Sequence, residues 1–113
     1  MTKDERAALF SELRRIADET REFNYIPARF LQDLATSDPG ELIARYVLAP
    51  RPSAGFERLW QEGRLDVAVE NVAWKYRHLF PPAVGEAAAK RLKAVGFDVH
   101  GQRMAPARSS RDR

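Results

Sequence analysis

The chain has 113 residues, no cysteine, and 19 Lys and Arg side chains against 16 Asp and Glu, which gives a formal net charge of +3. This length fits one domain, and the lack of cysteine excludes disulfides, a thiolate nucleophile and cysteine-ligated zinc or iron–sulfur sites. The apolar runs are far shorter than the ~20 residues that span a bilayer, and the first residues lack the apolar core of a signal peptide. We therefore expect a soluble, cytoplasmic protein with no membrane partner.

The N-terminal third of the chain predicts two helices. Thr2 and Glu5 have the spacing of a capping box, and apolar residues then recur at helical spacing. Asn24 can cap a second helix that ends near Thr36. Pro27 falls in the first turn of that helix, where a missing N–H costs nothing.

Two more helices are predicted on either side of a proline-rich break. Asp38 can cap a third helix, because its carboxylate can accept from first-turn N–H groups and the proline after it fits the first helical position. Pro50 and Pro52 must end this helix, since proline disfavours helix at and before its own position. A fourth helix then begins at Ser53 and ends at Gly63, which can adopt a left-handed conformation.

The last two helices lie on either side of a second pair of prolines. Asp66 is predicted to cap the fifth helix, and the periodicity places Glu70 and Asn71 largely on its outer side. Pro82 opens a sixth helix, which Gly96 ends.

The excess positive charge lies in the C-terminal tail. Residues 1–100 contain as many acidic as basic side chains, whereas residues 101–113 contain four arginines and one aspartate. The tail has too few apolar side chains to offset the entropy lost on ordering, so we expect residues 100–113 to be flexible. Residues 1–99 are predicted to form a single all-α domain, a compact bundle of about six short helices.

The most distinctive stretch is GFERLWQEGRLDVAVE, residues 55–70. The pattern GF-x-x-LW-x-x-GRLD-x-x-VE resembles a family of small, uncharacterised bacterial helical domains. YIPARFLQDL before it, and HLFPP and AAAKRLKAVGFDV after it, extend the resemblance over residues 24–99. In that family the module occurs alone or beside other segments, and some members belong to suspected restriction-type systems. The resemblance implies a helical bundle with an accessory role in a defence or mobile-element system, and it assigns no catalytic residue.

Four polar residues near the turn between the fourth and fifth helices are candidate binding residues: Arg64, Asp66, Glu70 and Asn71. One hypothesis is that they line a polar groove for a charged ligand or partner. The structural alternative is that Asp66 caps the fifth helix, while Arg64 pairs with Glu70 or with a carbonyl at the end of the fourth helix.

The sequence contains no motif for catalysis or for metal binding. His78 and His100 lack the spacing of paired metal ligands, and the glycines form neither a dinucleotide-binding motif nor a phosphate loop. We therefore expect a non-catalytic interaction or accessory module without cofactor or metal. Its partner is predicted to be another protein or a second copy of the chain, because Phe10 widens the apolar stripe of the first helix beyond what a small core needs.

Weak nucleic-acid binding is the alternative function. Basic residues at the end of the sixth helix and in the tail could make salt-sensitive phosphate contacts: Lys90, Arg91, Lys93, Arg103, Arg108, Arg111 and Arg113. A helix-turn-helix centred on Gly63 fits poorly, because its recognition helix would open with Asp66 and Glu70, which repel phosphates.

Overall fold

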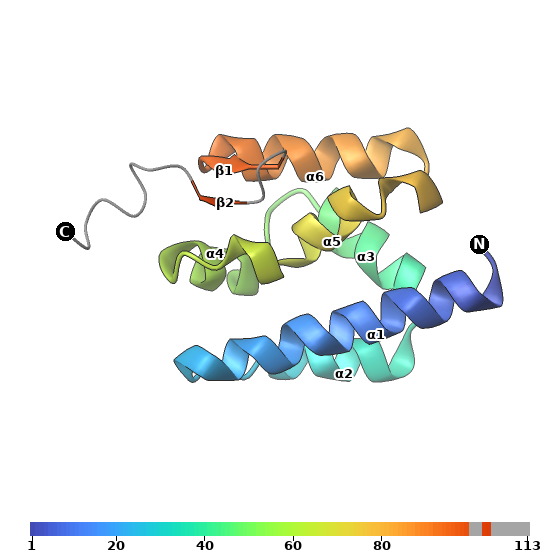
Figure 1. Ribbon diagram of the computed structural model, residues 1–113, viewed down its shortest axis with the longest axis horizontal. Coiled ribbons are helices and arrows are strands. Elements are labelled where there is room, and N and C mark those ends of the chain that lie inside the picture. Colours follow the sequence, from blue (N-terminus) through green and yellow to red (C-terminus); the bar gives the residue numbers. More distant parts are fainter. Residues whose placement is uncertain (100–102, 105–113) are drawn as a thin grey trace.

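The computed structural model describes residues 1–99 and the backbone of residues 103–104, and its fold is the compact all-α bundle that the sequence predicts (Figure 1). The helical elements follow in the order α1 (Lys3–Glu19), η1 (Thr20–Phe23), α2 (Ala28–Thr36), α3 (Pro39–Leu48), α4 (Ala54–Gln61), η2 (Leu65–Val67), α5 (Val69–Lys75), η3 (Arg77–Leu79) and α6 (Pro82–Ala94), where η marks a 3-10 turn. Strands β1 (Phe97–Asp98) and β2 (Arg103–Met104) form an antiparallel pair that the sequence did not predict. The rest of the predicted flexible tail lies outside the described residues.

The helices are arranged in layers around a central α5. In Figure 1, α1 and α2 lie side by side on one face, α6 covers the opposite face, and α3 and α5 lie between them. The apolar faces of these layers meet in one core, whose largest nearly inaccessible side chains are Leu9, Leu13, Leu42, Ile43, Leu65, Leu92 and Phe97. Because α5 is central, most of its side chains face other helices and few face solvent.

Local capping sets the starts of three helices as predicted. Thr2 and Glu5 form both bonds of a capping box, with N···O distances of 2.7 and 3.0 Å. The Asp38 carboxylate accepts from the first turn of α3, and the Ser53 hydroxyl accepts from the N–H of Phe56 in α4. These side chains satisfy N–H groups that the helix itself leaves unpaired.

Two predicted caps are wrong. Asn24 adopts a left-handed conformation (φ +61°) and ends η1, so α2 starts only after Pro27 and without a side-chain cap. Asp66 lies within η2, and Ala68 precedes α5, again with no side-chain cap. Asn24 is the residue that ends a 3-10 turn and Asp66 lies inside one, so neither residue stands directly before the helix that it was expected to cap.

Gly63 and Gly96 end helical segments with the positive φ values expected of them, +71° and +86°. Beyond Gly96 the chain folds back and buries Phe97, which is only 2% exposed. The turn at Gly63 directs the chain from α4 into η2 and so positions the residues around Asp66.

Replacing Gly63 by Ala should lower the free energy of unfolding by about 1 kcal/mol, measured by urea denaturation. A Cβ at this position would have no neighbour within 4 Å, so the cost comes from the left-handed backbone and not from a clash. Gly63→Asn is the control and should lose less, because asparagine tolerates this conformation. Equal stability of wild type and Gly63→Ala would contradict this account.

Candidate functional site

The four residues of the predicted polar groove do not line one groove. Arg64 and Asp66 are half-buried at the surface, whereas Glu70 and Asn71 are only 3% and 1% exposed. The expectation that Glu70 and Asn71 lie outside is therefore wrong. The reason is the central position of α5, which packs against α3, α6 and α1 and has neighbours where a surface helix would have solvent.

Arg64 ties the turn after α4 to the end of α1. Its guanidinium donates to Asp66 at 3.0 and 3.1 Å, to Glu19 at 2.9 Å and to Glu22 at 3.2 Å. These carboxylates, Asp66 first among them, raise the pKa of Arg64 above its ordinary value. The predicted pairing of Arg64 with Glu70 is wrong, and Arg64 and Asp66 form a surface cluster with the carboxylates of α1 and η1.

Glu70 pairs with Arg91, which projects from α6 into the interior. Arg91 Nη1 lies 3.1 Å from Glu70 Oε2, and the two side chains are 14% and 4% exposed. The same guanidinium donates to the carbonyl oxygens of Tyr46 at 3.1 Å and Ala49 at 2.7 Å, at the end of α3. One arginine thus joins α3, α5 and α6.

This pairing removes Arg91 from the predicted nucleic-acid contacts, since its donors are committed to the interior. Lys90 and Lys93 are exposed on α6. The side chains of the other predicted contacts lie outside the described residues: Arg103, Arg108, Arg111 and Arg113. Nucleic-acid binding stays a prediction, and on α6 it rests on two lysines.

Burial raises the pKa of Glu70 above its ordinary value, and the hydrogen bond from Arg91 only partly opposes this shift. Taking a carboxylate out of water disfavours its charged form, whereas a nearby guanidinium favours it. Within the described part of the chain, Arg91 is the one side chain that donates to this carboxylate.

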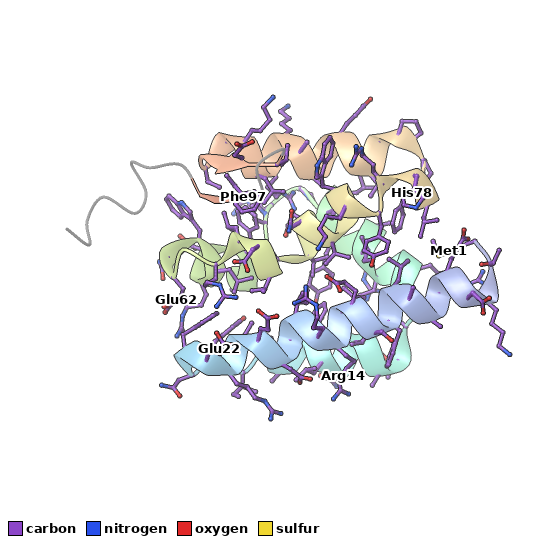
Figure 2. The ribbon with its side chains drawn as sticks, viewed as in Figure 1. Met1, Arg14, Glu22, Glu62, His78 and Phe97 are labelled. Carbon is purple, nitrogen blue, oxygen red and sulfur yellow. The ribbon has the colours of Figure 1, made fainter. Side chains whose placement is uncertain are left out.

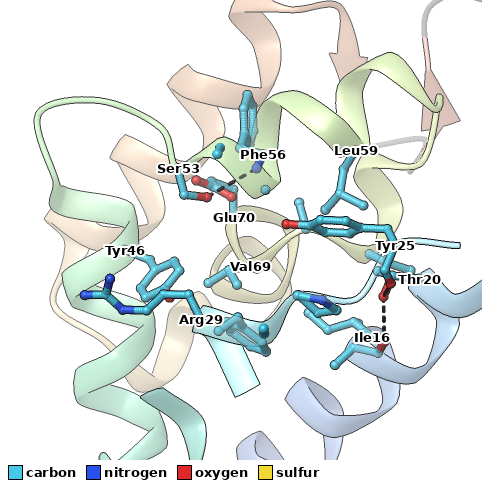
Figure 3. A pocket seen from close by; sticks show the side chains of 18 residues that line it. Ile16, Thr20, Tyr25, Arg29, Tyr46, Ser53, Phe56, Leu59, Val69 and Glu70 are labelled. Atoms are coloured by element: carbon cyan, nitrogen blue, oxygen red, sulfur yellow. Dashed lines mark hydrogen bonds between the residues drawn. The ribbon is translucent and has the colours of Figure 1, made fainter. Parts of the chain in front are cut away.

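A cavity of about 210 Å³ adjoins Glu70, between the end of α1, the start of α2, the start of α4 and the η2–α5 segment (Figure 3). We call it the Glu70 cavity. In Figure 3, Glu70 lies near Ser53 and Phe56, while Ile16 and Thr20 line the other end. Most of the wall is apolar and comes from Ile16, Ala17, Phe30, Phe56, Leu59 and Val69.

The polar groups of the Glu70 cavity are mostly used by the fold itself. The Thr20 hydroxyl lies 2.7 and 2.9 Å from two carbonyl oxygens, and Ser53 caps α4. Tyr46 donates to Asp33 at 2.8 Å, and burial together with this bond raises the pKa of Tyr46 to about 12. The Tyr25 hydroxyl makes no hydrogen bond to any described residue. Apolar walls with a few polar groups are typical of a binding pocket.

A second hollow lies on the outer side, between α1 and α2. We call it the Phe10 groove, and its wall includes Phe10, Arg14, Asp18, Arg21, Ile26 and Leu31. Phe10 is 41% exposed and Ile26 is 58% exposed. A helix capped by Asn24 would place Ile26 on its apolar inner face, but α2 begins only at Ala28, so Ile26 lies outside the helix and is exposed.

Among the residues that the structure describes, no group of three or more His, Asp or Glu side chains could hold a metal ion. In the same part of the chain, no helix combines the length and the apolar character needed to cross a membrane.

Comparison of the chain with protein-family models, curated proteins and solved structures gave no match. The resemblance over residues 24–99 therefore stays a prediction.

Replacing Arg91 by Met should lower the free energy of unfolding by about 3–5 kcal/mol, because it leaves the Glu70 carboxylate buried without its partner. The double variant Arg91→Met with Glu70→Leu should be more stable than Arg91→Met alone, since it removes the stranded charge as well. Guanidinium denaturation of the wild type and the two variants measures both effects. A double variant less stable than Arg91→Met would show that the carboxylate has a structural role apart from this pair.

The raised pKa of Glu70 predicts a specific dependence of stability on pH. Its contribution to stability is fully present below 4.5, the ordinary value, and is lost as pH rises through the higher folded-state pKa. Relative to Glu70→Gln, the wild type should therefore lose stability as pH rises from 4.5 towards neutrality. Denaturation of both proteins across this range measures the difference.

Glu12 is a control, because its pKa is shifted in the opposite direction from that of Glu70. The hydrogen bond from Arg15 lowers the pKa of Glu12, so its contribution is present above 4.5 and is lost as pH falls through the lower folded-state pKa. Relative to Glu12→Gln, the wild type should lose stability as the solution is acidified. If both pairs shift in the same direction, Arg91 outweighs burial at Glu70.

Proposed function

We propose that the protein is a non-catalytic helical interaction module that binds another protein chain through the Phe10 groove. The observation that carries the proposal is the exposure of two large apolar side chains, Phe10 and Ile26, at one hollow between α1 and α2. Exposed apolar patches on small domains commonly mark contact surfaces. A partner chain would remove both side chains from water, which is a favourable contribution to binding.

The charges around the Phe10 groove indicate what a partner must offer. Arg14 and Arg21 form no ion pair within the described residues. Figure 2 shows Arg14 on the side of α1 that faces away from α6. By contrast, Arg15, Arg58, Arg64 and Arg91 all pair with carboxylates of their own chain. Carboxylates at the edge of an apolar partner surface would therefore complement this groove.

A second copy of the chain meets this requirement. Asp18 lies at the groove four residues after Arg14, so a copy related by a twofold axis offers both signs of charge along the same helix. A twofold contact is the commonest form of self-association, because one patch serves both chains. We therefore propose a homodimer with α1 and α2 at its interface.

Sedimentation equilibrium over a range of concentrations tests the proposal. We expect the wild type to self-associate, and Phe10→Asp and Ile26→Asp to weaken association at least roughly tenfold, since each replaces an apolar contact with a charged group whose desolvation is costly. Leu48→Asp is the matched control. It also replaces an exposed apolar residue, 52% exposed, but on α3 and outside the groove, and it should leave association unchanged.

Two results would contradict the homodimer. One is a wild-type chain that stays monomeric at its highest soluble concentration. The other is a dimer that Leu48→Asp weakens as much as Phe10→Asp does, which would place the interface elsewhere on the surface.

A further inference from the structure

The Glu70 cavity has the size and the walls of a site for an aromatic ring. Its volume of about 210 Å³ exceeds the roughly 150 Å³ of an apolar cavity known to hold benzene. Phe30 from α2 and Phe56 from α4 both line it. Aromatic rings favour stacked or edge-to-face contacts with other rings, so these two side chains favour an aromatic guest. The wall also includes Val67, Ala68 and Val69, so a ring would be covered from the η2–α5 side as well.

The cavity opens between the starts of α2 and α4. Ala28, Arg29, Ser53 and Ala54 line it and are exposed, which places them at its rim. Gly55 lies at the same rim, where a Cβ would come within 3.0 Å of the Tyr25 hydroxyl. Glycine at position 55 therefore lets the Tyr25 hydroxyl lie close to the backbone of α4 at the mouth of the cavity.

The inner polar group of the cavity sets the chemistry of a guest. An ionised carboxylate only accepts hydrogen bonds, and Arg91 contacts Glu70 through Oε2. Above the raised pKa of Glu70, a guest that reaches its carboxylate must therefore donate an N–H or O–H, and a guest that offers only an acceptor oxygen would be repelled. Because Arg91 already balances the charge of Glu70, an uncharged guest fits better than a cation.

We infer that the Glu70 cavity binds a small, uncharged aromatic molecule that carries one N–H or O–H donor, with its ring between Phe30 and Phe56 and its donor on Glu70. We assign the site to a free small molecule, and the aromatic side chain of a partner protein is the other outcome of the test. This inference does not depend on the homodimer, since the Phe10 groove is a different surface.

Indole and benzofuran are probes that test the inference directly. They have nearly the same size and shape, but indole donates an N–H where benzofuran has an acceptor oxygen. Isothermal titration of the full chain should show saturable binding of indole, at least roughly tenfold tighter than binding of benzofuran. Amide chemical-shift changes on adding indole should centre on Tyr25, Gly55 and Glu70.

Two variants locate the binding site. Gly55→Leu should abolish indole binding, because the new side chain occupies the rim and displaces the Tyr25 hydroxyl, which lies 3.0 Å from the position of the added Cβ. Urea denaturation of the variant should show that the fold is kept. Ala83→Leu, which enlarges an exposed residue in the first turn of α6, is the matched control and should bind indole normally. Glu70→Gln should reduce the preference for indole over benzofuran.

Several results would overturn the inference: no saturable binding of indole up to its solubility limit, equal affinity for the two probes, or unchanged binding by Gly55→Leu. Shift changes centred on the Phe10 groove would also overturn it. N-acetyltryptophanamide carries the indole ring on a peptide unit. If it binds as tightly as indole, the site takes a partner's side chain and the assignment to a free small molecule is wrong.

Discussion

The buried pair of Glu70 and Arg91 is the interaction on which the arrangement of the helices depends. Arg91 bonds to a carboxylate on α5 and to two carbonyl oxygens at the end of α3, so three helices meet at one guanidinium. A buried arginine and a buried carboxylate are each costly alone, and their desolvation is offset only when both find partners. The pair therefore fixes how α6 sits on α3 and α5, and it places a carboxylate at the wall of a cavity.

A second group of ion pairs, those of Arg64, lies at the surface. Arg64 joins the turn after α4 to Glu19 and Glu22 at the end of α1, and its guanidinium also lies near the ring of Phe23. The two arginines act on opposite sides of α5: Arg91 fixes it to α3 and α6, and Arg64 fixes the segment before it to α1. The Glu70 cavity lies between α1, α4 and α5, so the ion pairs of Arg91 and Arg64 both affect the shape of the cavity.

The sequence predicted features whose causes are local. Thr2 and Asp38 could be recognised as caps because their partners lie three residues away, and Ser53, the start of the predicted fourth helix, caps α4 across the same interval. The burial of Glu70 could not be predicted in this way, since Arg91 is 21 residues distant and neither residue has a signature of its own. The cavity escaped prediction for a related reason, because its wall is assembled from segments between Ile16 and Glu70.

The Glu70 cavity and the Phe10 groove share part of their walls. Ala17 and Pro27 line the Glu70 cavity on one side and the Phe10 groove on the other, so the two sites are separated by little more than these side chains. A partition this thin transmits displacement: an occupant that pushes it from one side changes the space on the other. If an occupant does displace these side chains, occupancy of the two proposed sites is thermodynamically linked, and each occupant then alters the affinity for the other by the same factor.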